Sequence, residues 1–152
     1  MSFPTYERYK DSGVEWLGEI PEHWGMLSLK NVAKVDNSGC YGKEPESGAN
    51  LLPVATTAQI SAHGRFLIDK MPLRSFADQE LARYLCVPGD ILVVKSSGSA
   101  ENVISGKAGL FDESTPPFIF SNFLLRARPN RQRVNPKFLY ALLTCHLGGA
   151  AK

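Results

Sequence analysis

The residues with the clearest chemical potential are cations near the C-terminal end of the chain. Guanidinium and ammonium groups at high density suit binding to the phosphates of a nucleic acid. If residues 126–128 are extended, their two arginines share one face, because strand side chains alternate. A solvated basic loop or a surface for a partner subunit is the alternative. Five such charges fall within twelve residues: Arg126, Arg128, Arg131, Arg133 and Lys137.

A second candidate group is a polar loop that directly follows an apolar run. The run at 90–95 contains Ile-Leu-Val-Val and predicts a buried strand. A Gly-Ser loop after it lets backbone N–H groups approach phosphates, and a lysine supplies charge. An ordinary hairpin turn is the alternative. The loop consists of Lys95, Ser96, Ser97, Gly98 and Ser99.

Two asparagines and one more lysine complete the candidate DNA-binding set. The amides of Asn102 and Asn122 can pair bidentately with adenine in the major groove, although Asn122 can equally cap the end of a strand. Lys107, the first residue of the strand predicted at 107–111, is also a candidate DNA-binding residue. Lys43 and Arg65 lie in predicted loops and are weaker candidates.

Catalytic patterns are missing from the sequence. It contains no GxxxxGK[ST] phosphate loop, no GxSxG elbow, no methyl-transfer signature and no paired carboxylates suited to nuclease metal chemistry. The histidines have no HxxxH spacing, and Cys40, Cys86 and Cys145 form no CxxC pair. We therefore expect no catalytic residue, no metal and no cofactor, with the cysteines serving as small apolar side chains.

Composition bounds the class of protein. A chain of 152 residues with 43% hydrophobic residues suits one globular domain. It contains no apolar run near the ~18 residues of a membrane helix, and residues 1–10 lack the apolar core of a signal peptide. We expect a cytoplasmic protein without membrane contact. Residues 1–90 carry a net charge of −3 and residues 91–152 a net charge of +5, which indicates a polyanion-binding face in the C-terminal half, with a solvated basic surface as the alternative.

Hydrophobic periodicity predicts an α+β fold, with a mixed central sheet and flanking helices. We expect an anchor segment at 1–27, a recognition domain at 28–147 and a tail at 148–152. Trp16 and Trp24 flank a rigid Ile20-Pro21 turn, so both indoles should be substantially buried. The predicted strands lie at 51–56, 65–68, 90–95, 107–111 and 119–127, and the predicted helices at 28–35, 75–85 and from Asn135 to Gly148.

Several motifs in fixed order carry a family resemblance. Residues 9–24 read YKDSGVEWLGEIPEHW, followed by VPGDIL at 87–92 and GKAG at 106–109. A closing strand at 124–129 and an Asn-Pro helix start with Phe-Leu-x-x-Leu-Leu complete the pattern. This order resembles the specificity subunits of type I restriction–modification enzymes, over about residues 9–147.

The resemblance implies a noncatalytic domain that binds double-stranded DNA and reads one half of a bipartite target. Its partners would be the modification (methyltransferase) and restriction subunits, which would bind S-adenosylmethionine, magnesium and ATP themselves. A full specificity subunit has two such domains and long pairing helices, so we expect this chain to be a fragment or a half-subunit. A degenerate domain that acts as a protein-interaction module, or an enzyme of unknown type, are the alternatives. The cation cluster and the 95–99 loop should lie on one face.

Overall fold

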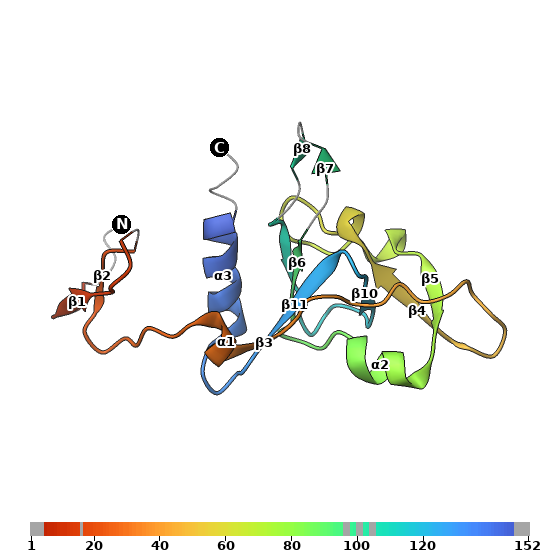
Figure 1. Ribbon diagram of the computed structural model, residues 1–152, viewed down its shortest axis with the longest axis horizontal. Helices are drawn as coiled ribbons and strands as arrows, with labels where there is room; N and C mark the ends of the chain where they lie inside the picture. The colour runs from red at the N-terminus through yellow and green to blue at the C-terminus, as the bar shows by residue number, and fades with distance from the viewer. Residues whose placement is uncertain (1–4, 16, 96–97, 100–101, 104–105, 148–152) are drawn as a thin grey trace.

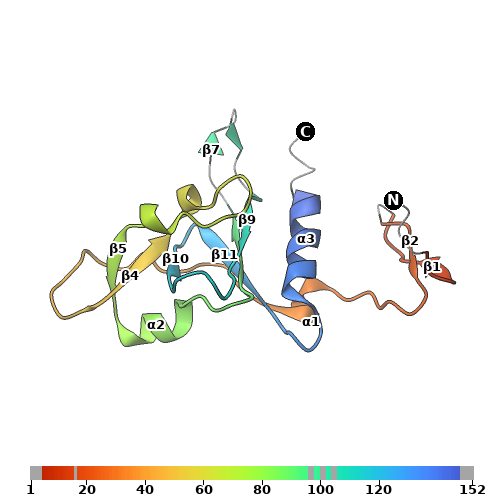
Figure 2. The same cartoon turned by 180° about the vertical axis from the view of Figure 1, so that it is seen from behind.

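A computed structural model of the chain describes residues 5–15, 17–95, 98–99, 102–103 and 106–147. Short helices are interspersed among strands that pair mostly antiparallel, so the predicted α+β class is confirmed. Figures 1 and 2 show two sheets packed in one body, with α3 on one side of them and a small N-terminal hairpin beyond α3. The helices are α1 (Leu29–Val32), α2 (Asp78–Tyr84) and α3 (Pro136–Leu147), with 3-10 turns η1 (Thr57–Gln59) and η2 (Ile68–Lys70).

The central sheet has four antiparallel strands in the order β3-β11-β6-β9. β6 lies inside the sheet, and all four of its residues are buried. Leu92 and Val94 face one apolar cluster, and Ile91 and Val93 face another. A strand covered on both faces needs a continuous apolar run, which explains its sequence. The strands are β3 (Ala33–Asp36), β6 (Ile91–Val94), β9 (Ala108–Leu110) and β11 (Leu124–Pro129).

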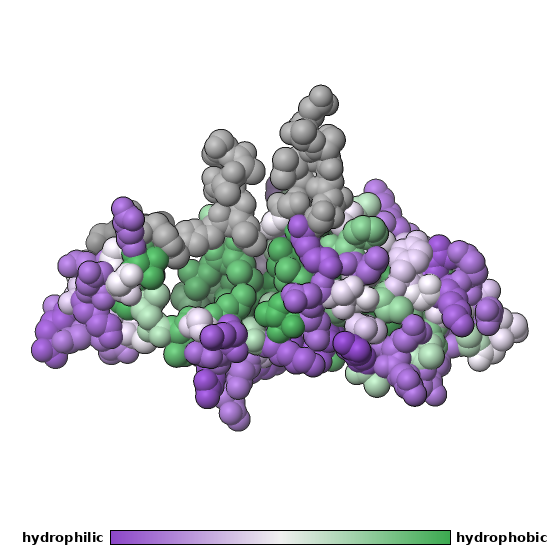
Figure 3. Space-filling view, in the orientation of Figure 1, coloured by the Kyte–Doolittle hydropathy of each residue, from purple (hydrophilic) through white to green (hydrophobic). Residues whose placement is uncertain are grey.

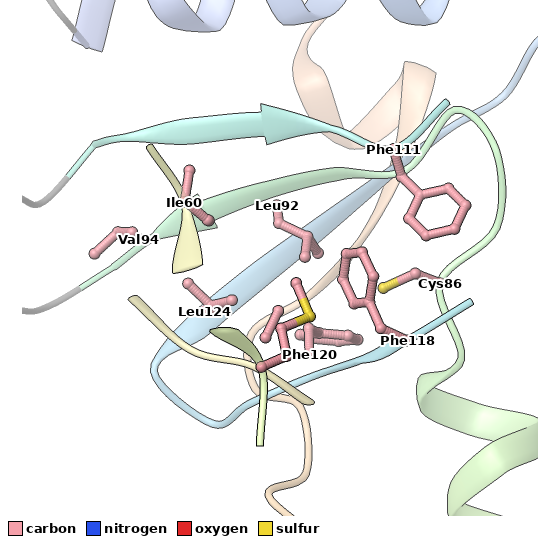
Figure 4. Close-up of a cluster of buried hydrophobic side chains, with 10 residues drawn as sticks. Ile60, Cys86, Leu92, Val94, Phe111, Phe118, Phe120 and Leu124 are labelled. Atoms are coloured by element: carbon pink, nitrogen blue, oxygen red, sulfur yellow. The ribbon is translucent and has the colours of Figure 1, made fainter. Parts of the chain in front are cut away.

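A second sheet of three strands packs on one face of the central sheet. Its order is β10-β4-β5, with β10 parallel to β4 and β5 antiparallel to it. The main core fills the space between the sheets (Figure 4). Phe118 there packs against the rings of Phe66 and Phe111, at centroid distances of 4.9 and 5.1 Å. The strands are β4 (Asn50–Ala55), β5 (Leu73–Phe76) and β10 (Ile119–Phe120).

The other face of the central sheet is covered by α3. Leu139 of this helix is buried with Ala33, Ile91 and Ala127 of three neighbouring strands. The helix begins at Pro136, as predicted, and the Asn135 side chain accepts a hydrogen bond from the backbone N–H of Lys137 at 2.9 Å. Both faces of the sheet are therefore covered, and its strand ends carry the exposed polar residues.

Three predicted elements differ from the structure, besides the strand predicted at 119–127, which is interrupted at residues 121–123. The helix predicted at 28–35 is only one turn, because Ala33 begins β3, where it pairs with β11. The helix predicted at 75–85 starts at Asp78, because Ser75 lies in β5 and pairs with Leu51. Residues 65–68 form only a single bridge, between Ile60 and Phe66, rather than a strand. For the two helices, long-range strand pairing outweighs the local pattern.

The N-terminal segment folds into a hairpin of β1 (Tyr9–Asp11) and β2 (Glu19–Pro21). Ile20 and Pro21 are buried, as a rigid turn would require. The predicted burial of Trp24 is wrong, because the residue is 41% exposed and its ring makes only edge contacts, with Tyr6 at 6.2 Å and with Phe138 at 6.1 Å between ring centres. Trp16 lies outside the described residues. Within the described part of the chain, no helix has both the length and the apolar character to cross a membrane.

Candidate nucleic-acid interface

Three strands of the central sheet end beside one another. Val94 of β6 pairs with Leu124 of β11, so the end of β6 meets the beginning of β11. The backbone N–H of Lys95 donates to the carbonyl oxygen of Phe123 at 3.3 Å, and its ammonium group donates to the carbonyl oxygen of Asn37, just after β3. We call this exposed edge the strand-end face; it comprises Asn37, Lys95, Lys107, Asn122 and Phe123.

Lys107 joins this face through the backbone. Its carbonyl oxygen accepts the N–H of Val94 at 2.8 Å, and its ammonium group donates to the carbonyl oxygen of Ile60 at 3.2 Å. Both lysines thus satisfy part of their hydrogen bonding on neutral carbonyls. No described carboxylate lies within ion-pair distance of either ammonium group.

A two-stranded ribbon extends the chain beyond the strand-end face. β7 (Gly98–Ser99) pairs with β8 (Asn102–Val103) in antiparallel register. Figure 1 shows this ribbon projecting from the end of the sheet above β6. The predicted candidates Gly98, Ser99 and Asn102 therefore lie on it, whereas Ser96 and Ser97 fall outside the described residues.

Arg126 is not at the surface, so its prediction as a DNA contact is wrong. Its side chain is 1% exposed, with its guanidinium 4.8 Å from the centre of the Phe120 ring. Two of its nitrogens donate to one carboxylate oxygen of Asp36, at 2.7 and 3.1 Å. Nη2, one of these two nitrogens, also donates to the carbonyl oxygen of Arg83, and Nη1 donates to that of Leu85. The cause is the sheet order: Arg126 pairs with Leu92, and this side of β11 is covered by the second sheet.

Arg128 shares that face with Arg126, as strand alternation predicted. It makes a bidentate pair with the fully buried Asp90, at 2.7 and 2.8 Å, and donates to the carbonyl oxygen of Leu85. The hydrogen bonds to Asp90 raise the pKa of Arg128 above its ordinary value. Asp90 also accepts the backbone N–H of Val87 at 2.9 Å. The Arg128 guanidinium thus holds the 83–90 segment against the sheet, through its bonds to Asp90 and to the Leu85 carbonyl oxygen.

The Asp36 carboxylate is held ionised by this network. Burial raises its pKa, but the hydrogen bond from Arg126 and the charges of Arg126, Lys34 and Arg128 together lower it below its ordinary value. A carboxylate with a depressed folded pKa contributes stability that is present above its unfolded pKa of about 3.9 and is lost as pH falls through its folded pKa.

Asp36→Asn should therefore be destabilising in a pH-dependent way. The loss of unfolding free energy relative to the unchanged chain should be constant above about pH 5 and should shrink as pH falls below about 4. Urea unfolding between pH 2 and 7 measures it. Asp69→Asn, at an exposed position, is the matched control. A loss that stays the same down to pH 2 would show that the Asp36 charge contributes nothing.

The other two predicted arginines lie at the opposite end of β11. Arg131 donates to the carbonyl oxygen of Pro88, and Arg133 to that of Asn31 at 3.2 Å. Both follow Pro129, the last residue of β11, whereas Asn122 precedes the first. The single face predicted for the loop and the arginines is therefore wrong: β11 separates the two groups along its whole length.

Sequence reasoning missed Phe123, Asp36 and Asp90. The exposure of Phe123 was not predicted because residues 119–127 have the pattern of one continuous strand. In the structure, Asn122 and Phe123 form a tight turn between β10 and β11. Asp90 lies in the Gly89-Asp90 motif of the family resemblance, which was the available signal. The described residues contain no cluster of three or more metal-ligating side chains.

Comparison with known proteins gives a consistent result in sequence and in fold. No protein-family profile matches the chain. A Methanocaldococcus jannaschii protein, assigned by name as the MjaX specificity subunit of a type I restriction enzyme, is 28% identical over 145 residues, which are 94% of this chain. The HsdS subunit of Thermoanaerobacter tengcongensis superposes with a TM-score of 0.59 at 17% identity, over 95% of this chain.

A chain from a structural study of type I restriction–modification assembly and conformational transition superposes similarly, with a TM-score of 0.58 and 17% identity over 95% of this chain. The chain spans about a third of the length of each of these proteins, 32% in every case. The resemblance found in the motifs is thus confirmed: the chain is similar, in sequence and in fold, to one domain of a type I specificity subunit.

Proposed function

We propose that this chain is a noncatalytic DNA-recognition domain that reads one half of a bipartite target and directs partner methyltransferase and endonuclease subunits to it. The observation that carries the proposal is the similarity to specificity subunits, which extends over nearly the whole chain in both sequence and fold. The one-third coverage fits a single recognition domain out of a larger subunit.

The geometry of the strand-end face supports DNA contact there. Lys95 and Lys107 bring positive charge to the same edge as the Asn122 amide. The β7–β8 ribbon projects from this edge, and a two-stranded ribbon is narrow enough for the major groove of B-DNA. Arg131 and Arg133, at the far end of β11, become candidates for a separate contact with the phosphate backbone rather than for base recognition.

The thiols closest to the core support a noncatalytic role. Burial, followed by the Asp90 charge, raises the pKa of Cys86, and burial and a hydrogen bond to Glu80 raise the pKa of Cys40. A nucleophilic cysteine needs the opposite shift, because the thiolate is the reactive form. Neither thiol is therefore suited to nucleophilic catalysis. In the proposed function, methyl transfer and cleavage belong to the partner subunits, which would also bind the cofactors.

Phosphate contacts by the two lysines should appear in the salt dependence of binding. Each phosphate neutralised on duplex DNA adds about 0.9 to the slope of log K against log salt concentration. Lys95→Ala and Lys107→Ala should each reduce that slope by about 0.9, measured by fluorescence anisotropy with a random-sequence duplex between 50 and 200 mM salt. Lys10→Ala in β1, which likewise removes one lysine charge, should leave the slope unchanged.

The absence of any binding to duplex DNA at 50 mM salt would refute the proposed function. Binding with equal slopes for all three variants would instead remove the two lysines from the interface. We expect the affinity to be weak, because half of a bipartite site offers few contacts.

A protein-interaction module without DNA binding is the second candidate, and one observation favours it. A groove of about 560 Å³ lies between the N-terminal segment and α3, with Trp24, Leu27, Phe138 and Leu142 exposed along it. Figure 3 shows apolar surface gathered over α3. A contiguous apolar patch of this kind is typical of a contact with another polypeptide. The DNA-binding measurement above separates the two candidates.

A further inference from the structure

The turn between β10 and β11 carries the most exposed phenylalanine of the described chain. Phe123 is 55% exposed, whereas Phe120 and Phe118 just before it are fully buried. A single exposed apolar side chain means little by itself. Here, however, the other residues of the strand-end face are polar or cationic. The exposed Phe123 ring is therefore not part of an apolar patch on this face.

Four backbone hydrogen bonds hold the turn in place. Ser121, fully buried, donates its N–H to Ala55 at 2.9 Å and accepts the N–H groups of Gly39 at 3.3 Å and Leu124 at 3.2 Å. Phe123 accepts the N–H of Lys95 at 3.3 Å. The turn is therefore tied to three neighbouring segments. A rigid platform loses little conformational entropy on binding, which favours its use in recognition.

We propose that this turn reads an A·T base pair in the major groove of DNA, with the Phe123 ring against the thymine methyl group and the Asn122 amide on the adenine. The proposal rests on the proposed function and names the base chemistry recognised at that site. An A·T pair presents N7 and N6 of adenine beside O4 and the C5-methyl group of thymine. An amide and an apolar ring on adjacent residues match the two halves of that edge.

The charges around the turn suit this orientation. The backbone N–H of Lys95 donates to the Phe123 carbonyl oxygen, and the backbone carbonyl oxygen of Lys107 accepts the N–H of Val94. These backbone bonds place both lysines at the same strand end as the turn. Cations on this side can contact the phosphates beside the base pair while the turn enters the groove. A G·C pair offers no methyl group in the major groove, so the ring would gain nothing from it.

Removing one methyl group from DNA tests the proposal. Duplexes recovered from a random pool by binding to the full chain are resynthesised with thymine or with deoxyuridine, which differ only in the C5-methyl group. We expect the unchanged chain to bind the thymine duplex about fourfold more tightly, the factor expected for burying one methyl-sized group. Phe123→Ala should bind both duplexes equally, and Phe123→Leu should retain part of the preference.

Phe138→Ala is the matched control, because Phe138 is 46% exposed but lies on α3, away from the strand-end face. It should keep the full preference for thymine. Asn122→Ala should lose the sensitivity of binding to 7-deazaadenine, which lacks the N7 acceptor. Salt-sensitive binding that is equal for thymine and deoxyuridine in the unchanged chain would overturn the inference and leave the proposed function standing. The failure of every duplex to bind would overturn both.

Discussion

Arg126→Ala should destabilise the folded chain by about 3–5 kcal/mol, the cost of removing one partner from a buried ion pair. The guanidinium is 1% exposed and satisfies Asp36 at 2.7 Å while lying 3.8 Å from the carboxylate of the fully buried Asp90. Its removal leaves Asp36 without a guanidinium partner, with the Lys34 ammonium at 3.7 Å. It also removes one donor from the carbonyl oxygen of Arg83 and one of the two arginine donors to that of Leu85, where Arg128 remains.

Urea unfolding measures this loss directly, and a melting curve should show a fall of roughly 10 °C or more for a chain of this size. Arg65→Ala is the matched control: Arg65 is exposed, and its change should stay within about 0.5 kcal/mol. In the double variant with Asp36→Ala, the loss should be smaller than the sum of the two single losses, because the second change removes a charge already left unpaired. Additive losses would mean that the pair is not coupled.

Gly39→Ala should cost about 3 kcal/mol, at the upper end of the range for overpacking, and should also weaken DNA binding. A Cβ at Gly39 would collide with the carbonyl oxygen of Phe120 and lie 2.7 Å from its carbonyl carbon. That neighbour is backbone in a buried strand, so it cannot rotate away. The N–H groups of Gly39 and Cys40 donate to Ser121 and Phe120, so a displaced loop pulls on the residues directly before Asn122.

The matched control is Gly25→Ala, because a Cβ there would meet nothing within 4 Å. Its stability and its DNA binding should be unchanged. Thermal unfolding and anisotropy on the same duplex compare the two variants. If Gly39→Ala is as stable as Gly25→Ala, then the loop after β3 is not packed against β10. If it is less stable but binds DNA normally, then this packing supports the fold alone.

Much of the local structure was predictable from the residues themselves. The buried strand β6 follows from four consecutive branched apolar residues, and the start of α3 follows from Asn135 and Pro136. These signals are local, because backbone propensity and capping act within a few residues. The family resemblance was likewise visible, since motifs are matched by order and spacing along the chain.

The candidate site was predicted only in part. Alternation along β11 correctly put Arg126 and Arg128 on one face, and Lys95 and Asn122 do lie at neighbouring strand ends. Whether that face meets solvent depends on what packs against it, and no periodicity contains this information. A basic run that suggests an exposed phosphate-binding surface thus proves to contain a buried arginine, whose carboxylate partner Asp36 is ninety residues away.

The amino-acid sequence therefore specifies the α+β class, the family resemblance and the residue types that the proposed DNA contact would use. The placement of those residues came from the sheet order β3-β11-β6-β9, which buries one arginine, separates the 95–99 loop from Arg131 and Arg133, and brings Phe123 beside Lys95. The physical reason is that strand pairing joins segments dozens of residues apart. Its outcome depends on the combined burial of both sheet faces rather than on any local preference.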